Sequence, residues 1–244
     1  MKKIRILSID GGGMRGIIPA TILVYLEKQL KELTNNPNAR IADFFDLIVG
    51  TSTGGILSAF YLTPTSNKDP LKPSTQYSAQ EALSFYLENG YQIFNQSKRK
   101  NWLGLRHLVN AAKYSPLAIE NKLKSTFGDL KMSQLVKPCL ITTYNMVSKA
   151  AFFFNSREDN GKKRDFYLKD VLRSTSAAPT YFPPARIKNL KSEDRMYNID
   201  GGVFANNPSL CAYAEARNSE FEKFSNTPPT IEEMLFLSLG TGGG

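Results

Sequence analysis

The sequence predicts an α/β protein in which a parallel sheet carries helices on both faces. A β-branched run over Ile4–Ile9 and an apolar run over residues 47–49 have the pattern of buried strands. Each run leads through a glycine-containing turn into a helical segment. This strand–helix–strand–helix order is typical of a parallel sheet, because parallel neighbours need a crossover connection. With 244 residues the chain can bury a full core, and we expect a single domain over residues 1–244.

The first helix is predicted to follow the glycine-rich segment 11–16 and to stop at the polar segment 35–38. Pro19 fits its first turn, where no backbone N–H bond is lost. Apolar residues recur at intervals of three and four, so one face should be buried. The residues expected on that face are Ile22, Leu23, Leu26, Leu30 and Leu33.

The middle of the chain begins with a surface loop over residues 63–77, which are rich in Pro, Ser, Thr, Asn and Lys. Ser78 and Glu81 then form a capping box that opens a second amphipathic helix. Ser115 and Pro116 start a further helix that should end near Gly128.

The second half of the chain alternates short strands and short helices. We expect strands at 140–147, 150–154, 196–199 and Met234–Leu239, and helices at 170–178 and from 208 onward. The chain ends in a glycine loop directly after the last strand. A terminus of this kind favours a C-terminally truncated domain.

The charge is basic, with 31 Lys and Arg against 22 Asp and Glu, a net charge of +9. We find no nucleic-acid-binding motif, so an anionic membrane surface fits better as a partner, and a solvated basic face is the alternative. Residues 98–103 join a basic cluster to Trp102, the only tryptophan. This pairing suits a membrane interface. A charged loop with an inward-packed Trp102 is the alternative, and it is slightly favoured.

Cys139 and Cys211 have neither metal-ligand nor redox spacing, so we expect two buried, reduced thiols. The apolar stretch after Met1 ends at Asp10, too early for a signal peptide. No segment approaches the roughly 20 apolar residues of a membrane span. These features predict a cytoplasmic or peripheral membrane protein.

Ser52 is the candidate nucleophile, because it lies at the centre of a G-x-S-x-G pattern between a strand and a helix. Such a strand–turn–helix places the central serine at a sharp corner, at the positive end of the helix dipole. Gly50 and Gly54 flank it where side chains would collide with neighbouring backbone. The alternative is a Gly-Ser turn without chemical consequence.

A serine nucleophile needs a base, and His107 is the only histidine of the chain. His107 lies in a basic, apolar segment and before Asp200, which is not the serine–acid–histidine order of the α/β-hydrolases. We therefore expect a carboxylate to serve Ser52 directly, with its pKa raised or its alignment improved by the site.

Four aspartates lie at strand ends or beside the serine turn. Asp200 is the preferred base, because it ends a buried strand and two glycines, Gly201 and Gly202, follow it. Asp10 should have a structural task and accept backbone N–H groups within the glycine loop. The remaining two, Asp43 and Asp46, are expected to cap or solvate the strand.

The loop of Gly11, Gly12 and Gly13 offers backbone N–H groups before a helix, an arrangement suited to an oxyanion. With Gly16 the loop also spells the dinucleotide fingerprint G-x-G-x-x-G. That fingerprint expects an acidic residue at the end of the next strand, where this chain has Gly50 and the serine turn. The dinucleotide interpretation is therefore the weaker one.

Taken together, three ordered motifs resemble the patatin-like phospholipases, in the form of the bacterial-type patatin domain. The motifs are residues 10–16 (DGGGMRG), 50–54 (GTSTG) and 200–202 (DGG), and segments 176–183 and 237–242 are also similar to that family. The resemblance spans nearly the whole chain. One departure is Gly202, where many members have alanine, an exchange of one small residue for another. The other is the C-terminus, because members of the family usually continue past the last strand of this sequence.

The resemblance implies a three-layer α/β/α sandwich with a mostly parallel central sheet and a lipid acyl hydrolase that uses a Ser-Asp dyad. It implies Ser52 as nucleophile, Asp200 as base, and Gly12 and Gly13 as oxyanion-hole donors supported by Arg15. The motif glycines that it carries over are Gly11, Gly16, Gly50, Gly54, Gly201 and Gly202.

The sequence thus predicts serine-dependent hydrolysis of a fatty acyl ester in a phospholipid or lysophospholipid. No cofactor and no metal are expected, because the chain has neither a His or Cys cluster nor an acidic loop with calcium spacing. Two alternatives stay open: a non-catalytic lipid- or nucleotide-binding module on the same fold, and a general carboxylesterase or protease. Some bacterial members of the family need an activator, and the sequence leaves this requirement open.

Overall fold

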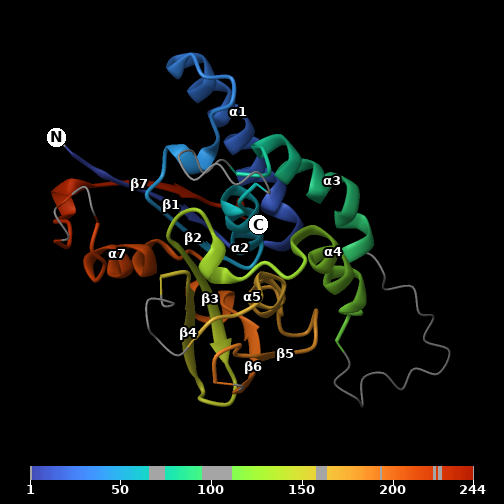
Figure 1. Ribbon diagram of the computed structural model, residues 1–244. Helices are drawn as coiled ribbons and strands as arrows, with labels where there is room; N and C mark the ends of the chain where they lie inside the picture. Colours follow the sequence, from blue (N-terminus) through green and yellow to red (C-terminus); the bar gives the residue numbers. More distant parts are fainter. Residues whose placement is uncertain are drawn as a thin grey trace, which may run out of the picture.

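A central β-sheet organises the chain (Figure 1). The computed structural model describes residues 2–65, 75–94, 112–157, 164–192, 194–221, 224 and 227–243. Seven strands pair in the order β5-β6-β3-β2-β1-β7, and β4 pairs with β3 off this path. The strands are β1 (Ile4–Ile9), β2 (Leu47–Thr51), β3 (Cys139–Asn145), β4 (Ala150–Asn155), β5 (Ala185–Lys188), β6 (Arg195–Asp200) and β7 (Met234–Leu239).

The middle of the sheet is parallel, as the sequence predicts. β1 runs parallel to β2 and β7, and β2 runs parallel to β3. At the other end, β4 and β6 each pair antiparallel with β3, and β5 pairs antiparallel with β6. β5 was not predicted from the sequence. It has only four residues, and alternate side chains are exposed. So short a run does not stand out from the proline-rich loop before it.

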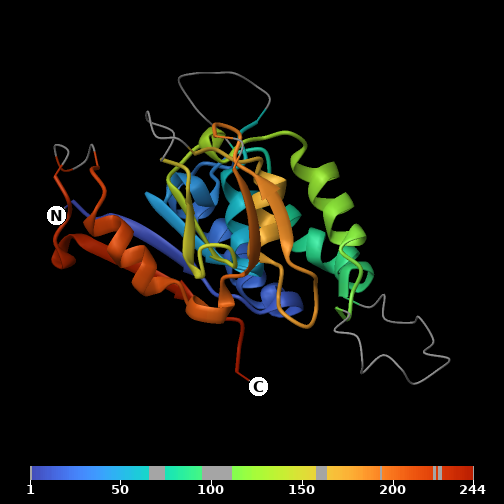
Figure 2. The same cartoon turned by 90° about the horizontal axis from the view of Figure 1, so that it is seen from below.

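Helices cover both faces and complete the three-layer α/β/α sandwich that the resemblance implies. Figure 2 shows the orange α7 along one face and the other helices on the opposite side of the sheet. The helices are α1 (Ile17–Thr34), α2 (Thr53–Leu62), α3 (Ala79–Phe94), α4 (Leu117–Phe127), α5 (Leu168–Thr175), α6 (Gly202–Ala205) and α7 (Ser209–Arg217).

Alternation along the central strands divides the core into two parts. In β2, Ile48 belongs to the large core under α1 to α5, while Leu47 and Val49 belong to the smaller core under α7. Side chains alternate between the two faces of a strand, so a strand buried on both faces is apolar throughout. This explains why the strand reads as an unbroken apolar run in the sequence.

The orientation of α1 differs from the sequence prediction. Pro19, Ala20, Leu23 and Glu27 are the buried residues of the helix, whereas Ile22 and Leu33 are 44% and 81% exposed. Of the other residues expected inside, Leu26 and Leu30 are half-buried. The helix is therefore rotated so that its inward stripe includes a carboxylate, which the apolar pattern could not indicate.

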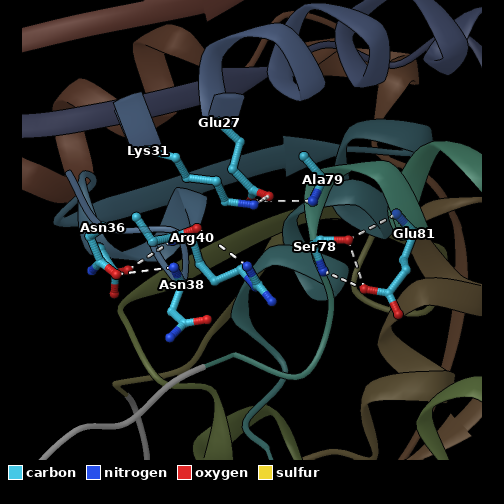
Figure 3. A network of polar contacts seen from close by, with 10 residues as sticks. Glu27, Lys31, Asn36, Asn38, Arg40, Ser78, Ala79 and Glu81 are labelled. Atoms are coloured by element: carbon cyan, nitrogen blue, oxygen red, sulfur yellow. Dashed lines mark hydrogen bonds and ion pairs between the residues drawn. The ribbon is translucent and has the colours of Figure 1, made fainter. Parts of the chain in front are cut away.

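Figure 3 shows how Glu27 is accommodated at the junction of α1 with α3. Its carboxylate forms an ion pair with Lys31 at 3.0 Å and accepts a hydrogen bond from the Ala79 backbone N–H at 3.2 Å. Ala79 is the first residue of α3, whose predicted capping box is present: the Glu81 carboxylate accepts from the Ser78 N–H at 2.8 Å. Glu27 thus links α1 to the N-terminal end of α3.

Two further predictions need correction at the residue level. The short helix expected at 170–178 begins earlier and ends earlier, as α5. Both cysteines are free, and Cys139 is buried as expected, but Cys211 is only half-buried. Residues 66–74 of the predicted loop, the basic segment 98–103 with Trp102, and His107 lie outside the described residues.

Candidate active site

Ser52 lies at the junction of β2 and α2, in a backbone conformation that is rare for a residue with a side chain. Its φ is 54° and its ψ is −119°. Such a conformation costs of order 1–3 kcal/mol and persists only where surrounding contacts hold it. The Ser52 N–H donates to Thr175 Oγ1 at 2.8 Å, which fixes the turn to the end of α5.

The two glycines beside Ser52 are required by close backbone contacts. A Cβ at Gly50 would lie 2.3 Å from the carbonyl carbon of Gly54, and a Cβ at Gly54 would lie 2.1 Å from the carbonyl oxygen of Ile9. Both distances are far below van der Waals contact, so β1 and the serine turn approach each other only because these residues lack side chains. The predicted role of the two glycines is thus explained by packing.

Asp200 ends β6 and faces Ser52. Its Oδ1 accepts a hydrogen bond from the Gly202 N–H at 2.7 Å, and its carboxylate and the Ser52 side chain line the same cavity. Asp200 is only 5% exposed. Burial raises the pKa of Asp200 to about 6, and its interactions with the Ser52 side chain and the Gly202 N–H oppose this rise.

β3 brings these two elements together, because it lies between β2 and β6 in the sheet. Thr142 in β3 and Thr51 in β2 are joined by a hydrogen bond of 2.7 Å between their hydroxyl oxygens. On the other side, a Cβ at Gly201 would lie 2.1 Å from Thr142 Oγ1. Gly201 therefore has to be a glycine for the turn after Asp200 to pack against β3.

The glycine loop after β1 closes the site from the side opposite Asp200. Gly13 has a φ of 57°, a conformation that favours glycine. A Cβ on Gly11 would lie 3.3 Å from the Ser52 Cβ, so the loop contacts the serine side chain. Among the described residues, neither the Gly12 nor the Gly13 N–H has a hydrogen-bond acceptor. Two unused donors beside a serine suit an oxyanion.

Arg15 lies on the outer side of this loop. Its Nη1 donates to the Gly242 carbonyl at 3.2 Å, and its backbone N–H donates to the Gly12 carbonyl at 3.1 Å. The guanidinium thus joins the glycine loop to the segment that follows β7. Gly16 completes the motif, since a Cβ there would lie 2.2 Å from Thr53 Oγ1.

Asp10 does not have the contacts expected of it. Its Oδ2 accepts a hydrogen bond from the Asn207 side chain at 3.4 Å, and its Oδ1 is buried without a partner in the described part of the chain. Partial burial raises the pKa of Asp10. Of the loop glycines, Gly11 donates its N–H to the Asn206 carbonyl at 3.0 Å and not to Asp10.

The other two aspartates have the structural roles that the sequence predicts. Asp43 accepts a hydrogen bond from the Arg40 N–H at 2.8 Å, and Asp46 accepts one from the Arg5 N–H at 2.9 Å. Both contacts cap the chain around the start of β2. Neither aspartate is a partner of Ser52.

A cavity of about 630 Å³ opens over Ser52 and Asp200, a size within the range of small-molecule sites. Gly12, Gly13 and Arg15 line its polar end. Its walls are mainly apolar and come from several helices and loops: Met14, Ile56, Phe85, Ile93, Ile119, Tyr114, Tyr181, Phe182 and Val203. Such a lining fits a hydrophobic chain beside a small polar reaction centre.

Within the described residues, no group of three or more His, Cys, Asp or Glu side chains could hold a metal ion. In the same part of the chain, none of the helices combines the length and the apolar character needed to cross a membrane.

Three residues around the site were not singled out as functional from the sequence: Thr175, Asn206 and Thr241. Thr175 holds the Ser52 N–H, while Asn206 and Thr241 both donate to the carbonyl of Gly11. Thr241 lies in the segment 237–242 noted in the sequence analysis, and Asn206 follows the third motif closely. Their roles depend on contacts between remote segments, so the motifs alone gave no reason to choose them.

Comparisons with known proteins agree with the motifs. A family model described as patatin-like phospholipase matches residues 7–212. The chain is 37% identical to Patatin-like protein 2 of Oryza sativa subsp. indica, over 99% of this chain and 62% of that protein. It is 37% identical to Patatin-17 of Solanum cardiophyllum, with 98% and 60% covered. A potato (Solanum tuberosum) relative at 37% identity, with 98% and 62% covered, is named a probable inactive patatin-3-Kuras 1.

The chain thus spans about 60% of the length of these relatives. Among solved structures, VipD from Legionella pneumophila aligns with 97% of this chain and 49% of its own, at 13% identity and a TM-score of 0.43.

Proposed function

Because the chain belongs to the patatin-like phospholipase family, we propose that it is a serine lipid acyl hydrolase of the phospholipase A or lysophospholipase type. The observation that carries this proposal is the placement of the Ser52 side chain and the buried Asp200 carboxylate together in the lining of one mainly apolar cavity. The substrate would place its acyl chain in the cavity and its ester carbonyl between Ser52 and the glycine loop.

The proposed reaction has two steps. Asp200 takes the proton of the Ser52 hydroxyl while Oγ attacks the ester carbonyl carbon, and the N–H groups of Gly12 and Gly13 stabilise the resulting oxyanion. The oxyanion collapses, the ester C–O bond breaks, and the leaving alcohol receives the proton from Asp200. A water molecule then gives a proton to Asp200 and attacks the acyl-enzyme. Release of the fatty acid returns the proton to Ser52.

The electrostatics of Asp200 support its role as the base. An ordinary aspartate is too weak a base to activate a serine, and a pKa of about 6 lies closer to neutral pH. At pH 7 the group is still mainly ionised and ready to accept a proton. The Gly202 N–H donates to one oxygen of the Asp200 carboxylate, and this bond holds the carboxylate in a fixed position next to Ser52.

We further propose that the protein acts at an anionic membrane surface, to which its net charge of +9 would attract it. The substrate would then be a phospholipid or lysophospholipid taken from that surface. The same proposal includes a requirement for an activator, as in some members of the family.

The proposal is tested by measuring fatty acid release from vesicles of mixed zwitterionic and anionic phospholipid. Wild type should release fatty acid, while Ser52→Ala and Asp200→Asn should lose activity by about a thousandfold or more. Ser58→Ala is the matched control, because the Ser58 hydroxyl bonds to the Gly54 carbonyl at 2.8 Å within α2. We expect Ser58→Ala to keep nearly full activity.

Two results would contradict the proposal. Release by Ser52→Ala at the wild-type rate would exclude this serine as the nucleophile. Hydrolysis of short soluble esters without any phospholipid hydrolysis would instead favour the general carboxylesterase. Labelling of Ser52 by a fluorophosphonate reports on nucleophile activation without depending on the lipid that is chosen.

A further inference from the structure

The carbonyl of Gly11 is held by two side chains from distant parts of the sequence. Thr241 Oγ1 donates to it at 2.8 Å, and Asn206 Nδ2 donates at 3.3 Å. Both side chains belong to loops that follow other elements: Thr241 comes after β7, and Asn206 comes after α6. A carbonyl in a glycine loop would otherwise be free to rotate, because glycine restricts its backbone least.

The orientation of the Gly11 carbonyl fixes the orientation of the Gly12 N–H bond through the peptide plane that the two groups share. The carbonyl of Gly11 and the N–H of Gly12 belong to the same peptide unit, which is planar and trans, so the two bonds point in opposite directions. Donors that hold the Gly11 carbonyl therefore also fix the direction of the Gly12 N–H, which points away from them. Gly12 lines the cavity over Ser52.

Thr241 makes a second contact that restricts the same unit. A Cβ added to Gly12 would lie 2.3 Å from Thr241 Oγ1, so the threonine packs directly against the Gly12 backbone. The side chain is 4% exposed, which removes competition from water for its hydrogen bond. Of the two donors, Thr241 has the shorter bond and the additional packing contact.

The pairing of two neighbouring strands brings Thr241 to this place. β1 and β7 run parallel with Ile9 opposite Leu239, and the Asp10 N–H donates to the Leu239 carbonyl at 3.0 Å. The glycine loop and the segment after β7 therefore leave the sheet side by side at the same level. Their contact is a consequence of strand register.

We propose that Thr241 is a positioning residue that orients the Gly12 N–H toward the oxyanion, through its hydrogen bond to the Gly11 carbonyl. The inference rests on the proposed function, because it assigns a task within the same acyl-transfer site. It makes the segment after β7 part of the oxyanion-binding machinery, although no hydrogen bond joins the described residues of that segment to Ser52 or Asp200.

The test compares Thr241→Val, which removes the hydroxyl and keeps the shape, with Thr241→Ser, which keeps the hydroxyl. Thr63→Val is the matched control: Thr63 is also 4% exposed, and its hydroxyl bonds to the Ala59 carbonyl at 2.8 Å at the far end of α2. For each variant we would measure kcat and KM with a soluble fatty acyl ester, the rate of fluorophosphonate labelling at Ser52, and the thermal midpoint.

We expect Thr241→Val to lower kcat by at least about tenfold with KM nearly unchanged, since an oxyanion donor acts mainly in the transition state. Fluorophosphonate labelling should slow in parallel, because that reaction also places an oxygen in the oxyanion position. Thr241→Ser should restore most of kcat. Thr63→Val should keep the wild-type kcat, even if its thermal midpoint falls as far as that of Thr241→Val.

Wild-type kcat in Thr241→Val would overturn the inference and leave the proposed function intact. So would a loss of kcat that Thr241→Ser does not restore, or one that Thr63→Val shares. If wild type neither hydrolyses esters nor reacts with the probe at Ser52, the proposed function itself fails, and the inference fails with it.

Discussion

At the scale of single residues, the site combines a strained serine with a buried carboxylate. The φ of 54° at Ser52 raises the free energy of the folded state. The contacts that hold it are the Thr175 hydroxyl on the Ser52 N–H and the glycines that let β1 approach. Burial of Asp200 is also unfavourable, and it is this burial that raises the pKa of the carboxyl group. Both features cost stability at the position where reactivity is needed.

The pKa of Asp200 predicts the pH dependence of the reaction. As a general base the carboxylate must be ionised, so kcat/KM should fall as pH drops through about 6 and reach a plateau above it. The expected profile is a single-proton step with its midpoint near pH 6. It is measured with a soluble ester from about pH 4 to about pH 8, which is about 2 units on either side of the step.

Asp170→Asn is the control for this profile. Burial also raises the pKa of Asp170, but the residue lies in α5 and outside the set of residues that line the cavity. Its removal should leave the midpoint where it is. A midpoint near 4, or a profile that is flat down to pH 5, would show that the base is an ordinary carboxylate or another group.

The sequence could indicate Ser52 and Asp200 but not the residues that orient them. Ser52 and Gly50 are neighbours in one motif, and the absence of a usable histidine left Asp200 as the best base. Thr241 and the Gly11 carbonyl are 230 residues apart, and only the register of β7 on β1 brings them together. A contact that depends on strand pairing has no local signal.

At the scale of elements, the link between α1 and α3 determines the position of one cavity wall. α3 contributes Phe85, Tyr86 and Ile93 to the cavity, and its first residue is held by Glu27. Glu27 is also the residue whose burial could not be predicted from the apolar pattern of α1. The Lys31 ammonium and the N-terminal end of α3 stabilise its charge, so a carboxylate can occupy the inward stripe.

This arrangement predicts that Glu27→Ala lowers the free energy of unfolding by about 1–3 kcal/mol, because it leaves the Ala79 N–H without its acceptor and Lys31 without its partner. Urea denaturation measures the change. Glu32→Ala, on the exposed side of the same helix, is the control and should change the free energy by about 0.5 kcal/mol or less. Equal effects of the two substitutions would show that the buried contact contributes nothing beyond helix propensity.

Most elements could be predicted from the sequence, because strands buried on both faces give continuous apolar runs. The two main errors in the fold, at β5 and α1, have different physical causes. β5 is too short and too exposed on one face to differ from a loop. Helix α1 offers two stripes of residues that could face inward, and the stripe that is buried contains Glu27. The contacts with Lys31 and Ala79 that stabilise the buried carboxylate of Glu27 form only in the folded chain.

At the scale of the whole molecule, the three-layer fold gathers the ends of several strands at one place. The glycine loop after β1, the serine turn after β2 and Asp200 at the end of β6 all reach the same cavity. The chain as a whole is basic, with a net charge of +9. A lipid substrate lies in an interface, so attraction to that interface would raise the local concentration of substrate.

The net charge of +9 therefore predicts salt-sensitive binding to vesicles that contain anionic lipid. Raising the ionic strength from about 0.1 M to about 1 M shortens the screening length from about 10 Å to about 3 Å, which removes most of the attraction between separated charges. In a sedimentation assay with Ser52→Ala, which leaves the vesicles intact, the bound fraction should fall steeply over this range. Binding to purely zwitterionic vesicles should be weak at either salt concentration.

Hydrolysis of a soluble ester by wild type is the control, and it should change little, because an uncharged substrate gains nothing from the protein's charge. If salt leaves the binding to anionic vesicles unchanged, apolar contacts must hold the protein there, and the basic residues would only solvate its surface.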